Sequence, residues 1–359
     1  MNEEIVTLES HLRVFPRNRA FGPEDYRCPG STTKLTVTSP RPGDNNKGFG
    51  MTMNTAFRHT TILLSTTLVL TACGGDMDNA TGTSAAMDDA AAVSITVTNA
   101  GFATPESVLH DTTDDVYLVS NINGMPLGED GNGFISRLSP DGEVLDLMWI
   151  DGADAGTTLN APKGMAIDGD MLYVTDINCV RMFDRATGSP AGEHCLGGAT
   201  FLNDLAPAIG GGVLFTDTGL DATFSPAGRD AVYRLNDGQL RTLLVNAQLG
   251  GPNGVLDTEE GPLIVTFGSG QVFRVSDGLK MVISGDSEGQ LDGIVEMADG
   301  RILISSWGAS CIYEMAPNGE MTCIIDDVEA PADIGTDVGR NRVLIPLFNA
   351  DTVLIRTVP

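Results

Sequence analysis

The sequence predicts an all-β fold, a six-bladed β-propeller, and three observations support this prediction. One pattern, an inner segment followed by an apolar strand, a turn and a further strand, recurs six times between Pro105 and the C-terminus. Equivalent positions lie 57, 40, 50, 39 and 40 residues apart, which is the spacing of propeller blades. Glycine is abundant and aromatic residues make up only 6% of the chain, as expected for short twisted strands joined by tight turns.

Each repeat contains the segments that a blade needs. The inner segments read ESVLHD, KGMAID, NDLAPA, NGVLDT, DGIVEM and ADIGTD. The apolar strands that follow read VYLVSN, LYVTDI, VLFTDT, LIVTFG, ILISSW and VLIPLF. Turn sequences then separate the outer strands: SPDG at 139–142, DRATG at 184–188, LNDG at 235–238 and PNG at 317–319. These residues favour the tight turns of hairpins.

Closure of the ring requires one strand from outside the repeats. The last repeat supplies three strands, whereas a blade has four. The alternating segment VSITVT, from Val93 to Thr98, can supply the fourth. We therefore expect the propeller to span 93–359 and to close by pairing this N-terminal strand with the last blade, which protects both sheet edges.

The 92 residues before the propeller are predicted to be processing and tether sequence. Residues 53–72 contain a basic residue, an apolar run and then small residues, the pattern of a signal peptide. The ending LTAC resembles the lipobox of bacterial lipoproteins and predicts lipidation of Cys73; an ordinary signal peptide ending there is the alternative. Residues 73–92 have the composition of a flexible tether. Residues 1–52 are either a wrongly assigned start or a disordered extension.

These features predict an exported protein in the periplasm that contacts the membrane only through its lipid anchor. Gly74 resembles the pattern for outer-membrane sorting. Residues 1–73 carry eight basic and six acidic residues, which leaves 13 basic and 42 acidic residues, a net charge of −29. Such a charge disfavours nucleic acid as a partner, and adaptation to a salty environment is an alternative reason for it. The predicted partner is a small-molecule substrate, and the sequence identifies no protein partner.

Four cysteines in the repeats predict two disulfides. Cys179 and Cys195 flank one outer hairpin, and Cys311 and Cys323 flank another, each with the turn midway between them. Residues opposite one another across a hairpin are close enough for a disulfide, and disulfides suit an oxidising periplasm. A cysteine metal site is the alternative, although the spacing is not that of a zinc knuckle.

One position of every repeat should converge on the central channel, because the first strand of each propeller blade lines it. This position is occupied in turn by Glu106, Lys163, Asn203, Asn253, Asp292 and Ala332. Four of these residues carry side-chain oxygens, which favours a hard cation, Ca²⁺ first and Mg²⁺ second. Zinc is disfavoured because the repeats contain only His110 and His194, which lack metal-ligand spacing and are expected to be structural.

The order of these residues resembles the gluconolactonase/regucalcin family and its paraoxonase relatives. The similarity rests on PESV, FLNDL, GPNGV and LDGI at the starts of successive inner strands, and it covers roughly Pro105 to Pro359. It implies a six-bladed propeller with Ca²⁺ in the channel and hydrolysis of lactones or esters. The chain departs from the family at Phe201, where the gluconolactonase-like enzymes have arginine, and it lacks the channel histidine pair of the paraoxonases.

The resemblance implies roles for the channel residues. Glu106, Asn253 and Asp292 would be Ca²⁺ ligands, and Asn203 would be a ligand or a substrate contact. Asp292 would also be the base that activates water. Lys163 could hold a substrate carboxylate or stabilise an oxyanion, or it could be a counter-ion that partly replaces the metal.

Residues at the ends of the second strands are expected to surround the channel mouth as substrate contacts: Asn121, Asp176, Asp217 and Trp307. The two aspartates resemble those of NHL repeats, where such a residue usually braces a turn, and Trp307 could equally cap the core. Insertions at 124–133 and 219–230 lengthen the loops after second strands, where specificity is usually found.

Two functions follow from this pattern. The first is a calcium-dependent hydrolase of a lactone or ester. The second is a non-catalytic NHL-like propeller that binds a small molecule or an envelope protein, with a structural Ca²⁺. A calcium that only locks blades together and a catalytic one are equally compatible with the four oxygen donors.

Overall fold

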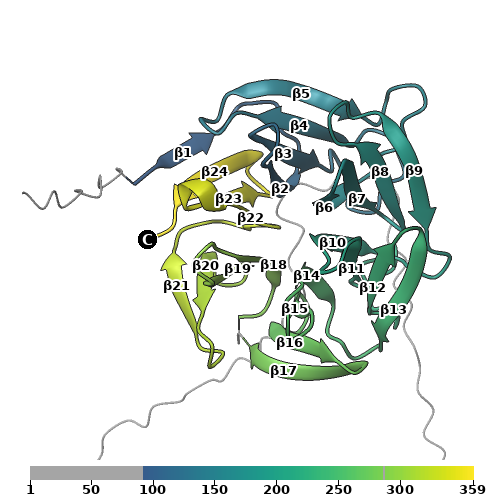
Figure 1. The fold of residues 1–359 in the computed structure, drawn as a ribbon, viewed down its shortest axis with the longest axis vertical. Coiled ribbons are helices and arrows are strands. Elements are labelled where there is room, and N and C mark those ends of the chain that lie inside the picture. Colours follow the sequence, from purple (N-terminus) through teal and green to yellow (C-terminus); the bar gives the residue numbers. More distant parts are fainter. Residues whose placement is uncertain (1–91, 286–287) are drawn as a thin grey trace, which may run out of the picture. The chain divides into compact units, whose positions relative to one another are not determined.

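The computed structural model describes residues 92–285 and 288–359. Twenty-four strands form six antiparallel sheets of four strands each, arranged around a central channel (Figure 1). The prediction of a six-bladed propeller is thereby confirmed. The predicted extension, signal peptide and lipidation site at Cys73 lie outside the described residues. In the described ranges, the protein has no helix with the length and apolar character needed to cross a bilayer.

The blades follow one another along the chain. The first contains β2 (Pro105–Asp111), β3 (Val116–Asn121), β4 (Phe134–Leu138) and β5 (Val144–Asp151). The second contains β6 (Pro162–Asp168), β7 (Met171–Asp176), β8 (Cys179–Asp184) and β9 (Pro190–Cys195), and the third contains β10 (Leu202–Pro207), β11 (Val213–Asp217), β12 (Ala231–Asn236) and β13 (Gln239–Val245).

The fourth blade contains β14 (Pro252–Leu256), β15 (Leu263–Thr266), β16 (Gln271–Ser276) and β17 (Leu279–Gly285). The fifth contains β18 (Leu291–Glu296), β19 (Ile302–Ser306), β20 (Cys311–Met315) and β21 (Met321–Ile325). The sixth combines β22 (Gly335–Asp337), β23 (Arg342–Leu347) and β24 (Thr352–Thr357) with β1 (Ser94–Val97) from the N-terminal end. A short 3₁₀ helix, Val338–Arg340, connects β22 to β23.

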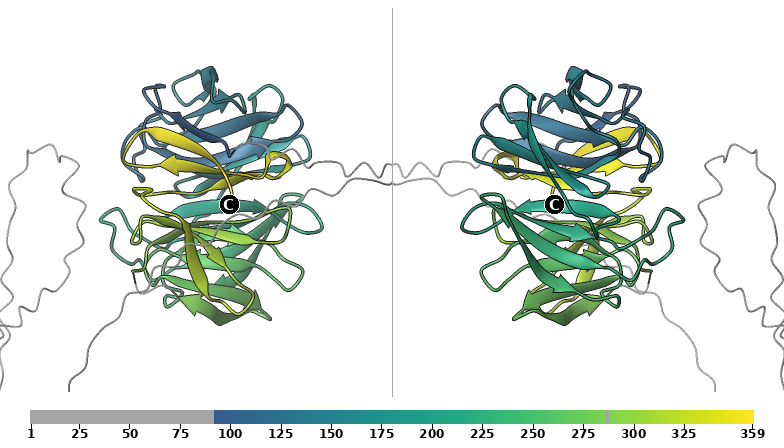
Figure 2. Two further views of the ribbon diagram at one scale, coloured as in Figure 1. Left: turned by 90° about the vertical axis from the view of Figure 1, so that its left-hand side faces the viewer. Right: turned by 90° about the vertical axis from the view of Figure 1, so that its right-hand side faces the viewer.

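Burial falls from the channel outward because the blades pack face to face. All six residues of β3 are buried, whereas most of β9, at the outer edge of the second blade, is exposed. The hydrophobic core is therefore a set of layers between neighbouring blades. One such layer joins Leu118 and Ile135 of the first blade to Met165 and Leu172 of the second. Figure 2 shows from two sides how the twisted blades stack around the ring.

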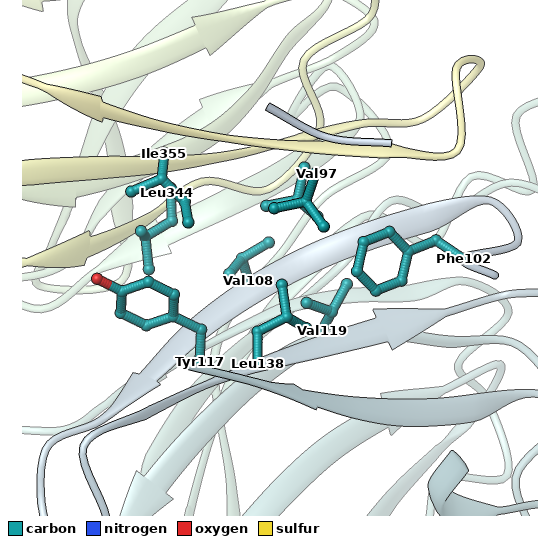
Figure 3. Packing of buried hydrophobic residues seen from close by; sticks show 9 residues of the cluster. Val97, Phe102, Val108, Tyr117, Val119, Leu138, Leu344 and Ile355 are labelled. Carbon is teal, nitrogen blue, oxygen red and sulfur yellow. The ribbon is translucent and has the colours of Figure 1, made fainter. Parts of the chain in front are cut away.

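The N-terminal strand closes the ring, as the sequence predicts. β1 pairs antiparallel with β24, from Ser94 opposite Arg356 to Val97 opposite Val353. Figure 3 shows the buried cluster at this seam, in which side chains of the first and sixth blades meet. Tyr117 of β3 also donates its hydroxyl to Asp337 Oδ2 of the sixth blade, at 2.7 Å. The buried seam cluster and this hydrogen bond hold the first blade against the sixth, which β1 completes.

Both predicted disulfides are present. Cys179 and Cys195 lie directly opposite each other on β8 and β9, with Cα atoms 4.0 Å apart. Cys311 and Cys323 join β20 to β21 with Cα atoms 6.0 Å apart. This second pair is not in direct register, because a bulge between Ile312 and Tyr313 shifts the partners along the strand.

Candidate functional site: a ring of unpaired oxygens in the channel

A β-bulge lies at the start of each of the first five inner strands, and the ring residue sits within it. The pairing register shifts between Pro105 and Ser107 in the first blade and between Pro252 and Val255 in the fourth. The other three blades show the same irregularity at Lys163, Asn203 and Asp292. A bulge leaves a residue outside the ladder and re-aims its side chain. It therefore turns these five side chains toward the channel.

Glycines beside the ring residues let neighbouring inner strands approach closely. A Cβ on Gly254 would lie 2.4 Å from the backbone oxygen of Asp292 in the next blade. A Cβ on Gly293 would lie 2.5 Å from the backbone nitrogen of Ile334. Any larger residue at either position would push the blades apart. The N-G and D-G pairs of these two repeats thus combine a polar ring residue with a close contact between strands.

Four of the ring residues place a buried oxygen in the channel without a hydrogen-bond partner. Each of these four side chains is at most 5% exposed. In the part of the chain that the structure describes, the unpartnered atoms are Glu106 Oε2, Asn203 Oδ1, Asn253 Oδ1 and Asp292 Oδ1. A buried polar atom left without a partner costs about 1–3 kcal/mol. A cation bound by these oxygens would satisfy them.

The donor set fits Ca²⁺ or Mg²⁺. It contains two carboxylates and two amide oxygens, which are hard ligands. The amide of Asn203 is oriented because its Nδ2 donates to Thr218 Oγ1 at 3.0 Å, which leaves the oxygen for the channel. In the described ranges, no group of three or more His, Cys, Asp or Glu side chains is arranged to hold a metal. A cation site here therefore depends on the two asparagines.

The carboxylates of the ring lack sufficient positive charge nearby. Burial raises the pKa of Glu106 well above its usual range, and repulsion from Asp292 and Asp333 raises it further. Burial and repulsion from Asp333 likewise raise the pKa of Asp292 well above normal. The side chains of Trp307 and Asn253, within hydrogen-bonding range of Asp292, partly oppose this shift. A divalent cation would favour the charged forms of both carboxylates.

Lys163 supplies a positive charge within this buried region. Its side chain is only 1% exposed, and Nζ donates to the carbonyl oxygen of Ala161 at 3.0 Å. Nζ also lies 4.8 Å from the centre of the Phe201 ring, a cation–π contact. Burial lowers the pKa of Lys163 to about 8, while attraction to Glu106 and Asp176 opposes this decrease. Phe201, where the resembling enzymes have arginine, thus forms one wall around the lysine.

Two further carboxyl groups, which the sequence analysis did not single out, lie next to the ring. Asp204 and Asp333 are buried and lie close enough for each to influence the pKa of the other. Burial raises the pKa of Asp333 to about 6, and burial together with Asp333 raises the pKa of Asp204 well above normal. Ser107 Oγ donates to Asp333 Oδ2 at 2.5 Å. Asp204 Oδ2 accepts from the Val255 backbone at 2.7 Å.

Three of the predicted substrate contacts make hydrogen bonds that brace turns. Asn121 accepts from the Ala103 backbone and donates to Val119 O and Ser136 Oγ. Asp176 accepts two backbone N–H groups and also binds Arg181. Asp217 accepts three backbone N–H groups, those of Thr200, Phe201 and Gly219. The polar atoms of Asn121, Asp176 and Asp217 thus brace turns, which is the alternative that the sequence analysis gave for the two aspartates, and their contact with a substrate stays a prediction.

Trp307, the fourth predicted contact, lies beside the ring. Its indole nitrogen is buried and has no well-aligned hydrogen-bond partner among the described residues, although it faces Asp292. Phe267 and Phe348 pack against its ring, with centroids 5.3 and 5.0 Å away. The two histidines of the repeats lie outside the ring: His110 pairs with Asp115 and packs edge-on against Tyr117, and His194 is on the outer strand β9.

No protein-family model matches the chain, and no curated protein matches it either. Solved structures do. A gluconolactonase from Xanthomonas campestris superposes with a TM-score of 0.58 at 20% identity, over 75% of this chain and 90% of that one. Regucalcin from Agrobacterium tumefaciens, a calcium-binding protein, gives 0.54 at 13% identity, over 73% and 93%. A streptogramin B lyase gives 0.52 at 11% identity, over 75% and 98%.

These similarities establish the fold. Gluconolactonase and regucalcin are the proteins that the order of ring residues resembles, and both share the propeller architecture. A lyase is built on the same architecture, so the fold alone does not assign a reaction. The assignment must come from the ring.

The raised pKa values predict how stability depends on pH and Ca²⁺. Glu106 and Asp292 ionise near pH 4 in an unfolded chain but at a higher pH when folded. Within that window the folded state holds more protons, so the free energy of unfolding falls as pH rises. For Asp333 the window runs from 3.8 to about 6. Ca²⁺ would offset the repulsion between the ionised carboxylates. The increase in Tm on adding Ca²⁺ should therefore be larger at pH 8 than at pH 5.

Thermal melts in Ca²⁺ and in chelator, at both pH values, measure this difference. A Ca²⁺ effect that is equal at the two pH values, or absent at both, would contradict a cation at the ring.

Proposed function

We propose that this protein is a calcium-dependent hydrolase of lactones or related esters, with the cation and the reacting carbonyl in the central channel. The observation that carries the proposal is the set of four unpartnered buried oxygens, because one of them belongs to a carboxylate that can act as a base. The gluconolactonase and calcium-binding regucalcin among the structural neighbours support a lactonase-type propeller.

Glu106, Asn203, Asn253 and Asp292 would hold the cation. When bound, Ca²⁺ would supply positive charge that polarises a carbonyl and lowers the pKa of a water molecule. Mg²⁺ is the alternative ion for the same ligands.

We propose that Asp292 also accepts the proton of the attacking water. Its Oδ1 has no partner among the described residues, and its pKa is raised by burial and by Asp333. A bound cation would lower this pKa, so that Asp292 would be charged and able to accept a proton. The indole of Trp307 and the amide of Asn253 lie near this carboxylate and partly oppose the rise in its pKa.

Replacing Asp292 tests this role. Asp292→Asn keeps the shape and one oxygen but removes the base, so kcat/KM for a lactone that the native protein hydrolyses should fall by about 10²–10⁴-fold. Acid release with a pH indicator, over a panel of lactones and esters in Ca²⁺ and in chelator, measures the effect. Asp299→Asn is the matched control, because Asp299 is an exposed carboxylate paired with Arg301.

The result that removes the hydrolase proposal is acid release unaffected by Asp292→Asn. Absence of turnover across the panel, with Ca²⁺ still raising Tm, would instead support a binding propeller with a structural ion.

We propose that Lys163 stabilises negative charge that develops on the substrate oxygen. It is the only ring residue with a positive charge, and its pKa of about 8 leaves it mostly protonated at neutral pH. Lys163→Met preserves most of the apolar stem and should lower kcat by about 10²-fold, with little loss of Ca²⁺ affinity. If the lysine were instead a counter-ion that competes with the metal, the variant would bind Ca²⁺ more tightly and keep its kcat; calcium titrations and steady-state kinetics distinguish these outcomes.

We also propose that the protein acts in the cell envelope, exported and lipid-anchored through Cys73. The LTAC sequence after an apolar run supports this location, and the two disulfides are consistent with an oxidising compartment. Cys73→Ser should move the protein from the detergent-extracted membrane fraction to the soluble envelope fraction. An unchanged distribution would contradict lipidation at this residue.

A further inference from the structure

Apolar side chains occupy the position immediately after the second strand in five of the six blades. Three consecutive blades place an aromatic residue there: Phe267 follows β15, Trp307 follows β19 and Phe348 follows β23. The first two blades place Ile122 after β3 and Ile177 after β7. The third blade has Thr218, whose hydroxyl is engaged with Asn203 and the Pro252 backbone.

The strand register puts this position at the same end of the channel as the ring. The last residue of the second strand pairs with the first residue of the inner strand, as in Pro105 with Asn121 and Leu291 with Ser306. The ring residue is the second residue of each of the first five inner strands. The residue after the second strand therefore lies further out than the ring, one residue beyond the level at which the inner strand begins.

These apolar side chains contact one another across blade boundaries. Trp307 joins Phe267 and Phe348 through ring contacts with centroids 5.3 and 5.0 Å apart. Phe348 in turn packs against a cluster that contains Ile122 and Ile177. Phe201, just before β10, covers the ammonium group of Lys163 on the third-blade side. We name this set the apolar collar; it consists of Ile122, Ile177, Phe201, Phe267, Trp307 and Phe348.

Both inserted loops add an apolar residue to the collar. The 124–133 loop supplies Leu127, which packs against the Ile122 and Ile177 cluster. The 219–230 loop supplies Phe224, whose ring lies 6.4 Å from that of Phe201. Asp221 holds this loop by accepting the backbone N–H groups of Thr223 and Ser225. Phe224 is 39% exposed, so it has surface available for contact with a ligand.

The collar and the ring have opposite chemistry. The ring offers oxygens and one ammonium group, whereas the collar offers hydrocarbon, and the polar residues below it are engaged in turns. Most hydroxyl groups of a sugar would lose their water partners against these hydrocarbon side chains, where the indole N–H of Trp307 is the donor that the collar offers, and this loss is costly. Hydrocarbon would instead gain about 3- to 4-fold in affinity for each buried methylene. The large negative charge of the chain further disfavours anionic ligands.

We propose that the apolar collar binds an uncharged alkyl or aryl substituent of the lactone or ester whose carbonyl reaches the ring, and that it selects such compounds over sugar lactones. The proposal rests on the proposed function for the orientation of the carbonyl. It goes further in naming the class of substituent and the residues that recognise it.

The test uses Trp307 as a reporter of binding. The chain has two tryptophans, so Trp149→Phe leaves Trp307 alone, and phenylalanine can retain the contact that Trp149 makes with Arg137 on the outer side of the first blade. The probes are non-hydrolysable lactams in Ca²⁺: 2-piperidones with 6-alkyl chains of increasing length, and gluconolactam as the sugar analogue. Fluorescence of Trp307 should saturate with the alkyl series, and Kd should fall about 3- to 4-fold per methylene for the first few carbons.

Phe224→Ala provides the matched collar variant, because an exposed loop residue can be truncated without a loss of folding. It should raise Kd for the longest alkyl lactam by about 3- to 10-fold and leave the effect of Ca²⁺ on Tm unchanged. Met281→Ala, which truncates a side chain 55% exposed on the outer strand β17, should leave both quantities unchanged.

Three results would overturn the proposal: binding that is independent of alkyl length, gluconolactam that binds as tightly as the longest alkyl lactam, or no fluorescence response to any lactam. The binding measurement and the turnover measurement test the collar and the hydrolase proposal independently. Chain-length dependence without lactone hydrolysis would support the collar and remove the hydrolase proposal. Hydrolysis of sugar and alkyl lactones with equal kcat/KM would retain the hydrolase and remove the collar's selectivity.

Discussion

The irregular start of the inner strands is the constraint on which the rest of the structure depends. A regular ladder would turn alternate side chains into the layers between blades, where only apolar groups can be accommodated at low cost. The bulges at the first five inner strands release one residue each from that rule. Glycines such as Gly254 and Gly293 then allow adjacent strands to approach where the side chains turn inward. The bulges and the glycines that permit close approach thus occur at the same few residues of the repeats.

This arrangement concentrates negative charge in a buried space. Glu106, Asp292, Asp204 and Asp333 all have raised pKa values, and burial is the largest cause for each. Lys163 offsets part of the charge by its attraction to Glu106. What remains is a group of oxygens that the fold holds together but does not satisfy. Such a group is suited to bind a ligand because the folded blades already hold the oxygens in position before the ligand arrives.

The periodicity of the sequence was sufficient to predict the blade number, the closing strand, the disulfides and the positions of the ring. A ring residue such as Asn253 is recognisable because its place in the repeat is fixed by the pattern of apolar strands around it. The roles of Asn121, Asp176 and Asp217 were harder to predict, since a polar residue at a strand end can face either a turn or the channel. Only the hydrogen bonds made by these side chains show that they brace turns.

The sequence alone could not predict which side chains of different blades contact one another. Asp204 was visible within FLNDL, but its partner Asp333 lies 129 residues further along the chain, in a repeat whose ring residue is alanine. The collar residues Phe267 and Phe348 read as ordinary strand ends, and their contacts with Trp307 arise only when the ring closes. The contact of Phe201 with Lys163 was likewise not predictable, because the lysine that Phe201 covers comes from another blade.

The closing strand β1 has a consequence for how the protein could be released from whatever precedes it. The outermost strand of the sixth blade begins at Ser94, so the segment upstream of it is joined to the strand that seals the ring. A peptidase that cuts before Val93 would liberate a propeller with all 24 strands. A cut within Ser94–Val97 would remove the partner of β24 and expose the edge of the last sheet. The boundary between shedding an intact domain and opening its ring is thus only a few residues wide.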